Sequence, residues 1–243
     1  MDKVIYAVWR KDGTSREEFN RILREEAAPK IAALDNVRGL RLNLQDAHVV
    51  RAEPLRQTAT DPQIDAGVQV WMDVSHDAFR KPIDDILAGI SKNIGAWQVT
   101  ESAIIPNSKH PPCAGERTAG WSQFCYLQKP ERLSYDEWRD HWQNSHTRVG
   151  IDTQSNFEYR QHLVVRALVP GPKDYVAMVE ECFPADAMDH PEVFFDAAGD
   201  PKKFEDNVRI MMKSCEGFID MGDPQTIDVL PTSQYEIKRP VWK

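Results

Sequence analysis

Two histidines and two tryptophans fall within nine positions of the segment EWRDHWQNSHTRV, residues 137–149. Imidazole changes its charge near neutral pH, so histidines in such a cluster indicate proton transfer or metal binding. At about 100° per residue of α-helix, Trp138 and Trp142 share a narrow stripe, which predicts that they pack in the core. His141 and His146 are then about 140° apart and are not expected to share one ligand. The spacing also differs from the i, i+4 histidine pair by which HExxH helices bind zinc.

His146 lies near the predicted end of this helix, and Gly150 follows as a C-terminal cap. Exposed carbonyl groups at a helix C-terminus favour protonated imidazole, which would allow His146 to donate a proton at neutral pH. The alternative is that His146 only caps those carbonyl groups. His141 is expected to be a peripheral, structural histidine.

The strand FEYRQHLVV that follows supplies a second set of polar residues. Alternation sends Glu158, Arg160 and His162 to one face and apolar residues to the other. If that polar face lines a cavity, Arg160 would bind an anionic oxygen and His162 would exchange a proton; on an open sheet it would be ordinary solvated surface. The first half of the chain repeats the alternation, with Arg41 and Asn43 opposite leucines.

Three strand aromatics, Tyr6, Trp71 and Tyr126, are candidate walls for a flat substrate, although aromatic residues in strands more often belong to the core. Adjacent carboxylates at positions 84–85 and 180–181 point apart on a helix or strand and are expected to be solvated. The predicted substrate-binding residues are therefore Arg160, Tyr126, Tyr6, Trp71, Asn43 and Arg41, and the predicted catalytic pair is His146 and His162.

The elements that position these residues come from an internal repeat. Both halves begin with a strand, a loop and an amphipathic helix opened by a serine N-cap with glutamate three residues later, as in a capping box. One offset of 119 positions pairs Ser15 with Ser134, Phe19 with Trp138, Arg41 with Arg160 and Asn43 with His162. Matching Tyr6 to Tyr126 needs an offset of 120, which one additional loop residue would explain.

Each half continues as βαββαβ, the ferredoxin-like unit of four antiparallel strands with helices on one face. A strand is expected over residues 37–50, another over 97–105, and helical segments over 185–195 and 201–218. Two such units cover each other's exposed sheets by packing sheet to sheet, which predicts an α+β fold, a fused dimeric α+β barrel with an inner cavity. The predicted boundaries are 1–105 for the first repeat, 106–120 for a Pro- and Gly-rich linker, and 121–243 for the second repeat.

Composition narrows the partners. A net charge of −8 with scattered basic residues disfavours nucleic acid, and no segment approaches a signal peptide or a membrane span, so a cytoplasmic protein is expected. Four cysteines without a CxxC pair indicate neither disulfides nor a thiolate metal site. The motifs GxGxxG, GxSxG and the Walker lysine are missing from the sequence, so no nucleotide cofactor and no metal is expected. Association of two chains into a homodimer stays open.

The run YDEWRDHWQNSHTRV followed by NFEYRQHLVV resembles the EthD family of dimeric α+β barrels, over residues 121 to 237. The resemblance implies dehydration, decarboxylation or isomerisation of aromatic or polyketide compounds, generally without a cofactor. Ala27 stands in the first repeat where the second has His146, so the resemblance implies one histidine-dependent site per chain.

The leading hypothesis is therefore a cofactor-independent lyase or isomerase acting on a small, aromatic metabolite by histidine acid–base catalysis. One alternative is a haem-binding barrel with His146 as axial ligand. Another is a non-catalytic accessory protein that binds a metabolite of a degradation pathway.

Overall fold

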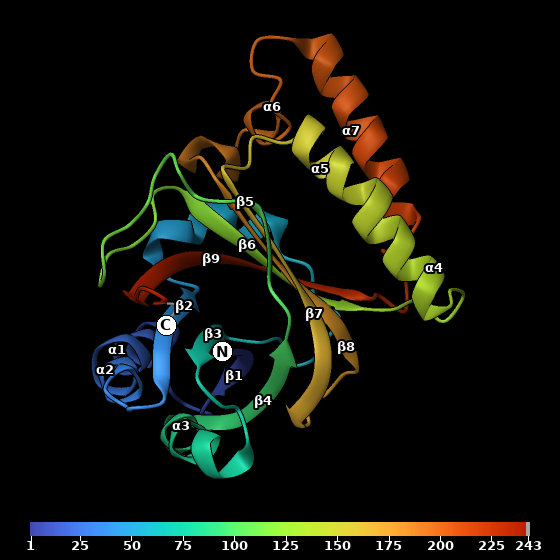
Figure 1. Ribbon diagram of the computed structural model, residues 1–243. Helices are drawn as coiled ribbons and strands as arrows, with labels where there is room; N and C mark the ends of the chain where they lie inside the picture. Colours follow the sequence, from blue (N-terminus) through green and yellow to red (C-terminus); the bar gives the residue numbers. More distant parts are fainter. Residues whose placement is uncertain (242–243) are drawn as a thin grey trace.

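Strands form a closed ring in the computed structural model, which describes residues 1–241, and helices cover the outside of the ring (Figure 1). The nine strands of the described residues are β1 (Asp2–Arg10), β2 (Val37–Leu44), β3 (Ala66–Met72), β4 (Ser91–Val99), β5 (Ser102–Ile105), β6 (Trp121–Gln128), β7 (Glu158–Val169), β8 (Tyr175–Phe183) and β9 (Ile227–Lys238). The helical segments are α1 (Arg16–Arg21), η1 (Ile22–Ala27), α2 (Ala28–Ala32), η2 (Ala47–Leu55), α3 (Asp77–Ile90), α4 (Tyr135–Asp140), η3 (His141–His146), α5 (Thr147–Thr153), η4 (Ala185–Met188), α6 (Pro191–Phe194) and α7 (Pro201–Glu216).

Each repeat contributes four antiparallel strands to the ring, in the orders β4-β1-β3-β2 and β9-β6-β8-β7. The two sets join edge to edge, because β2 pairs with β9 and β4 pairs with β7. Closure leaves the ring without open edges, which are the usual liability of a sheet. The predicted α+β fold, a fused dimeric α+β barrel, is confirmed.

Strand alternation divides the side chains between the helix-facing side and the lumen of the barrel. On β1, Val4 and Val8 pack beneath the helices of the first repeat, whereas Ile5 and Ala7 join a second apolar cluster with Phe124 inside the ring. The same alternation places charged side chains of other strands inside the barrel, where they need partners.

The first helix of each repeat begins at the predicted serine. Ser134 and Glu137 form the complete reciprocal capping box, whereas Ser15 accepts only the backbone N–H of Glu18, at 3.1 Å. Each of these helices then changes from α to π geometry and back, along α1-η1-α2 and α4-η3-α5. Both π segments obey the offset of 119, so the irregularity is part of the repeat.

The predicted tryptophan stripe is confirmed. Trp138 and Trp142 are buried side by side, with ring centroids 5.1 Å apart, in the apolar layer between the helices and the sheet of the second repeat. Across the described residues, none of the helices combines the length and the apolar character that crossing a membrane requires.

Three predicted elements differ from the structure. The strand expected over 37–50 ends at Leu44, and the 3-10 segment η2 follows. The strand expected over 97–105 is interrupted after Val99, because β4 pairs with the far half of β7 and β5 with its near half. The helix expected over 185–195 consists of two short pieces, η4 and α6.

Candidate functional site

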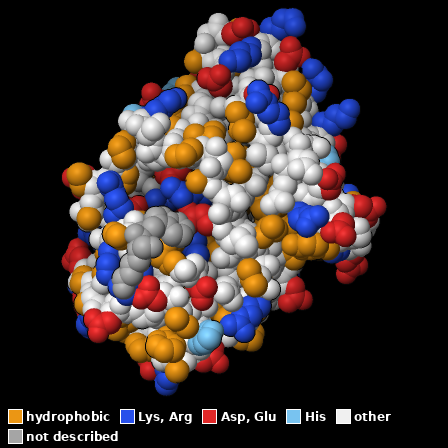
Figure 2. Space-filling view, viewed as in Figure 1, with side chains coloured by type: hydrophobic (Ala, Val, Ile, Leu, Met, Phe, Trp, Pro, Cys, Tyr) orange, Lys and Arg blue, Asp and Glu red, His pale blue; other side chains and the backbone are white. Residues whose placement is uncertain are grey.

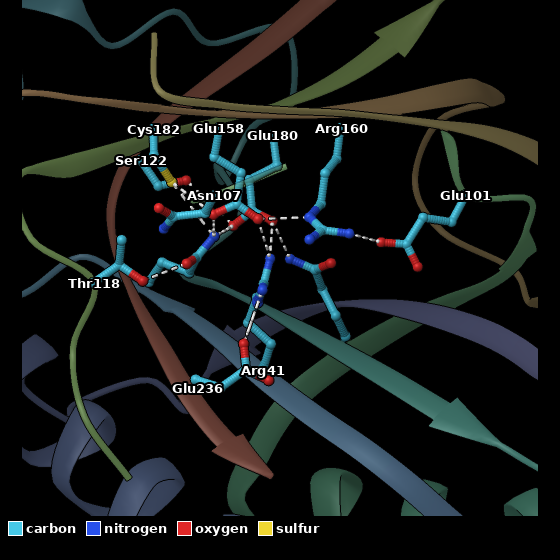
Figure 3. A network of polar contacts seen from close by, with 12 residues as sticks. Arg41, Glu101, Asn107, Thr118, Ser122, Glu158, Arg160, Glu180, Cys182 and Glu236 are labelled. Carbon is cyan, nitrogen blue, oxygen red and sulfur yellow. Dashed lines mark hydrogen bonds and ion pairs between the residues drawn. The ribbon is translucent and has the colours of Figure 1, made fainter. Parts of the chain in front are cut away.

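A group of charged side chains fills one end of the barrel lumen (Figure 3). Arg41 is its centre: Nη1 donates to Glu158 and Glu180 at 3.1 Å each, and Nη2 donates to Glu236 at 2.8 Å. The four side chains are almost fully buried. We call Arg41, Arg160, Lys3, His162 and the carboxylates Glu101, Glu158, Glu180 and Glu236 the lumen cluster.

Amide groups from three strands complete the surroundings of Glu180. Its oxygens accept from Asn43 at 2.7 Å, Gln69 at 2.9 Å and Gln234 at 2.8 Å, in addition to Arg41. Burial alone would raise the pKa of Glu180, but Arg41 and these amide donors outweigh it and lower the pKa to about 2. The carboxylate is therefore ionised at neutral pH and holds the centre of the barrel together.

Arg160 connects this centre to the cluster's other half. Its Nε donates to Glu158 and its Nη1 to Glu101, both at 2.5 Å. Glu101 also lies 3.3 Å from Lys3, and Lys3 Nζ lies 3.5 Å from Nε2 of His162. Burial lowers the pKa of Lys3 to about 7, although Glu101 counteracts it. Burial, and then the charge of Lys3, lower the pKa of His162 well below its usual value, so His162 is neutral.

A cavity of about 380 Å³ opens where the lumen cluster meets the end of the barrel. We call it the mouth cavity; Trp71, Glu101, Arg160 and Glu236 are among its lining residues. In the space-filling view, acidic and basic side chains gather in a hollow at the centre of this face (Figure 2). The segment predicted as a linker contributes Pro106, Asn107, Pro111 and Pro112 to the cavity wall.

Glu236 lines this cavity, and only one of its two carboxylate oxygens accepts hydrogen bonds from the described residues. Oε2 accepts both hydrogen bonds from Arg41, whereas Oε1 is buried and lacks a hydrogen-bond partner among the described residues. A buried carboxylate oxygen without a donor is costly, so this atom is ready to accept a hydrogen bond or a proton from a ligand.

The structure does not bring His146 and His162 together. His162 faces the lumen, whereas His146 lies on the helix side of the same sheet, where its Nδ1 is 2.9 Å from Oγ of Ser214 and its ring packs on Phe218 at 4.5 Å. Burial, and next to it His141, lower the pKa of His146 to about 4. The expectation of a protonated His146 paired with His162 across a pocket is therefore wrong.

The expected separation of His141 and His146 is also wrong, and the π segment η3 is the reason. Its i→i+5 hydrogen bonding brings residues five apart onto the same side of the helix, as the bond from Thr147 N–H to the Trp142 carbonyl shows. His141 Nε2 lies 2.9 Å from the backbone oxygen of Ser214, whose hydroxyl contacts His146. Both histidines therefore attach the first helix of the second repeat to α7.

The predicted aromatic residues also lie in different parts of the barrel. Trp71 lies at the mouth cavity, where Lys3 Nζ is 4.0 Å from its ring centroid and its Nε1 donates to Glu101 at 2.7 Å. Tyr126 faces the lumen but belongs to its apolar cluster, with Trp97 and Tyr175. The mouth cavity thus receives one of the three predicted aromatic walls.

Tyr6 lies outside the lumen, beneath the helices, and donates to Asp84 at 2.8 Å. Its position matches Cys125, which faces the helices of the second repeat, and not Tyr126. The offset of 119 therefore holds from the first strand onward, and the additional loop residue inferred from the two tyrosines is wrong.

The predicted binding residues Arg41, Asn43, Arg160 and Trp71 come together around the lumen cluster, and His162 lies beside Lys3 within it. Their roles in binding or catalysis stay predictions. Among the described residues, no group of three or more His, Cys, Asp or Glu side chains is arranged to hold a metal ion.

Comparison with known proteins agrees with this architecture. The family model of the EthD domain matches residues 130–222. The second repeat carries an EthD domain. The matched span includes the helix with His141 and His146, strands β7 and β8, and α7.

Solved structures resemble the whole chain beyond its EthD domain. An anthrone oxidase-like protein shares 8% identity, with a TM-score of 0.59, over 99% of this chain and 95% of that one. A monooxygenase candidate from Lactobacillus acidophilus shares 9% identity, with a TM-score of 0.45, over 98% of this chain and 96% of that one. At 8% identity, the likeness to the anthrone oxidase-like protein concerns the fold and not the reaction. No curated protein matches the sequence significantly.

The haem alternative does not fit the EthD domain of this chain. An axial histidine needs room for the macrocycle beside its free nitrogen. His146 is packed against Phe218 and hydrogen-bonded to Ser214, and it lines none of the three main cavities of the described residues.

Sequence reasoning missed the carboxylates of the lumen cluster and Lys3. Glu180 and Glu181 were expected to be solvated, but both are buried: Glu180 faces Arg41, and Glu181 faces the helix layer of the EthD domain. Asp84 is likewise partly buried, between Tyr6 and Arg80. The available signal was the alternation itself, because adjacent strand residues point to opposite faces and both faces of a covered barrel strand are buried.

Proposed function

We propose that the chain is an enzyme that moves a proton on a small, flat, oxygen-bearing metabolite in the mouth cavity, as a lyase or isomerase does. The observation that carries the proposal is Oε1 of Glu236, which is buried without a hydrogen-bond partner among the described residues, on a side chain that Arg41 holds and that lines the same cavity as Arg160. A volume of about 380 Å³ suits a metabolite of one or two rings.

Glu236 acts as the general base in this proposal. Arg41 fixes its Oε2 through two hydrogen bonds, which leaves Oε1 to take a proton from a C–H bond next to a carbonyl group. Because the donors to Oε2 come from one rigid guanidinium fork, the base is oriented before the substrate arrives.

Arg160 stabilises the oxygen on which negative charge develops. Its Nε and Nη1 are occupied by Glu158 and Glu101, so its position is fixed, and its guanidinium lines the mouth cavity. A preorganised cation at a partly dehydrated site stabilises an enolate more than water does. The face of Trp71 gives a flat wall on which an aromatic ring can rest.

His162 has a supporting role in this proposal. It is completely buried behind Lys3 and is not among the residues that line the mouth cavity. We assign to His162 the positioning of Lys3 and, through it, of Glu101, and to His146 the attachment of α7. In this proposal neither imidazole contacts the substrate.

The test is exchange of carbon-bound hydrogen with deuterated water, followed by NMR over a panel of small aromatic ketones and oxo acids. The wild type is expected to accelerate exchange in the substrate class, and Glu236→Gln to reduce the rate by a factor of about 10² to 10⁴ with little change in KM. Glu216→Gln, an exposed carboxylate on α7, is the control.

Exchange that survives Glu236→Gln but is lost in His146→Ala or His162→Asn would overturn the assignment of the base. Tight binding of a panel member without exchange or turnover would favour the accessory-protein alternative.

A further inference from the structure

A cavity larger than the mouth cavity lies on the outside of the barrel. It has a volume of about 710 Å³ and runs between the first helix of the first repeat and the segment 44–53, with Tyr235 of β9 at its inner end. We call it the outer groove. It shares no lining residue with the mouth cavity.

The helix wall and the 3-10 wall of the outer groove come from the first repeat. There β2 ends at Leu44 and η2 turns away to form the groove's second wall, whereas in the second repeat β7 continues as a strand to Val169. The offset of 119 puts Arg139 and Val164 where the groove has Asn20 and Gln45. The repeat therefore does not explain these two polar residues.

Two of the residues that line the groove carry buried acceptor oxygens without partners among the described residues. Asn20 and Gln45 are 7% and 4% exposed, and among the described residues Oδ1 of Asn20 and Oε1 of Gln45 accept no hydrogen bond. Their orientation is fixed, because each NH₂ group donates to backbone carbonyls: Asn20 to Gln45 at 3.0 Å, and Gln45 to Ile64 at 2.8 Å and Asp65 at 3.0 Å. Two acceptor oxygens on lining residues of the groove are thus left without a donor among the described residues, and both require one.

A carboxylate lies next to them. Asp46 accepts from the neutral donors Ser233 and Tyr235, at 2.7 Å each, and from the His48 N–H at 3.0 Å. Five carboxylates and three guanidinium groups line the groove; Arg21 pairs with Glu18, Arg24 with Glu25, and Glu53 with Arg56, which is not a lining residue. This leaves Glu17 and Asp46 against Arg16. The balance favours a cation. Nε of Arg16 is also buried and has no hydrogen-bond partner in residues 1–241, so it offers a donor to an oxygen.

We propose that the outer groove binds a small primary amine that also carries oxygen acceptors, such as an amino alcohol, amino acid or amino sugar. An ammonium group has three donors, which match the oxygens of Asn20, Gln45 and Asp46. An oxygen of the same ligand accepts from Arg16. This site is separate from the proposed catalytic site and does not depend on it.

Pairs of small molecules that differ only in an ammonium or a hydroxyl group test whether the groove recognises the charge. Ethanolamine is compared with ethylene glycol, and glucosamine with glucose, so that within each pair an ammonium group replaces a hydroxyl. Binding is measured by saturation-transfer NMR and titration calorimetry on the full chain. Each amine is expected to bind more tightly than its hydroxyl partner, with competition between the two amines.

Two variants locate the site. Asp46→Asn removes the charge and keeps an acceptor oxygen, and Asn20→Leu removes one amide oxygen; each is expected to weaken amine binding by roughly tenfold to hundredfold. Asn144→Leu, on the exposed face of the corresponding helix in the second repeat, should change nothing. Thermal unfolding of each variant shows whether it is folded.

The proposal is overturned if neither amine binds better than its hydroxyl partner. It is also overturned if folded Asp46→Asn and Asn20→Leu bind amines as the wild type does.

Discussion

Arg41 and Arg160 occupy the same position in the two repeats, yet their surroundings differ. Both arginines line the mouth cavity, but Arg41 is 6% exposed and is shared by three buried carboxylates, whereas Arg160 is 19% exposed and binds two carboxylates. The carboxylates around Arg41 come from β7, β8 and β9, all in the second repeat. The same position of the repeat thus holds a buried structural centre in the first repeat and a more exposed arginine in the second.

The largest expected effect on stability is that of replacing Arg41. Arg41→Met leaves Glu158, Glu180 and Glu236 buried without their shared cation, which should lower the free energy of unfolding by about 3–5 kcal/mol. Arg160→Met should cost less, about 1–3 kcal/mol, because Arg41 and Lys3 still face its carboxylates. Urea unfolding of both variants measures the difference, and equal losses would contradict the division of roles.

The neighbours Glu180 and Glu181 give the next contrast. Burial raises the pKa of Glu181 to about 7, although Asn156 and Gln123 donate to it. The folded state therefore keeps a proton that the unfolded state releases near pH 4.3, so this residue reduces stability as pH rises from about 4.3 to 7.

Glu181→Gln should remove that part of the decline, seen by comparing urea midpoints of variant and wild type across this pH range. The contribution of Glu180 to stability changes with pH in the opposite direction. Its lowered pKa stabilises the fold above about pH 4.3, and this contribution is lost as pH falls towards 2. An unchanged pH profile in Glu181→Gln would show that Glu181 is ionised in the folded protein.

The repeats also differ at position 146, where the second has His146 and the first has Ala27. His146→Ala copies the alanine of the first repeat and removes the contacts with Ser214 and Phe218, so the free energy of unfolding should fall by about 1 kcal/mol. Ligand binding at the mouth cavity should not change. A folded variant that no longer binds would move the functional site to the helix side of the EthD domain.

The smallest effect concerns the two helix starts. Ser134→Ala removes a reciprocal capping box and should cost about 1 kcal/mol, whereas Ser15→Ala removes a single bond and should cost about half as much. Thermal unfolding with each alanine variant measures this difference, and a larger loss at Ser15 would contradict it.

The features predicted correctly from the sequence are those that depend on residues close together in the chain. Serine caps, the tryptophan stripe and the alternation of β7 follow from spacing, and the offset of 119 led to the closed barrel and to Arg41, Asn43 and Arg160 inside it. His146 was mispredicted as a partner of His162 because the helices cover the outside of the sheet, whereas His162 faces the lumen. The relation of His146 to His141 was mispredicted because a 3.6-residue turn was assumed where the π segment η3 lies. The carboxylates around Arg41 were missed because their pairing joins residues as far apart as Arg41 and Glu236. Such distances leave no periodic signal in the sequence.

Closure of the ring has a consequence for how the chain folds. β2 must find β9 near the opposite end of the chain, and β4 must find β7, before either repeat loses its open edges. Contacts this distant in sequence slow folding, because chain entropy is lost before the contacts form. Before β9 pairs, the edge of β2 is open and Arg41 lacks Glu236, so ring closure is expected to be a late and slow step of folding.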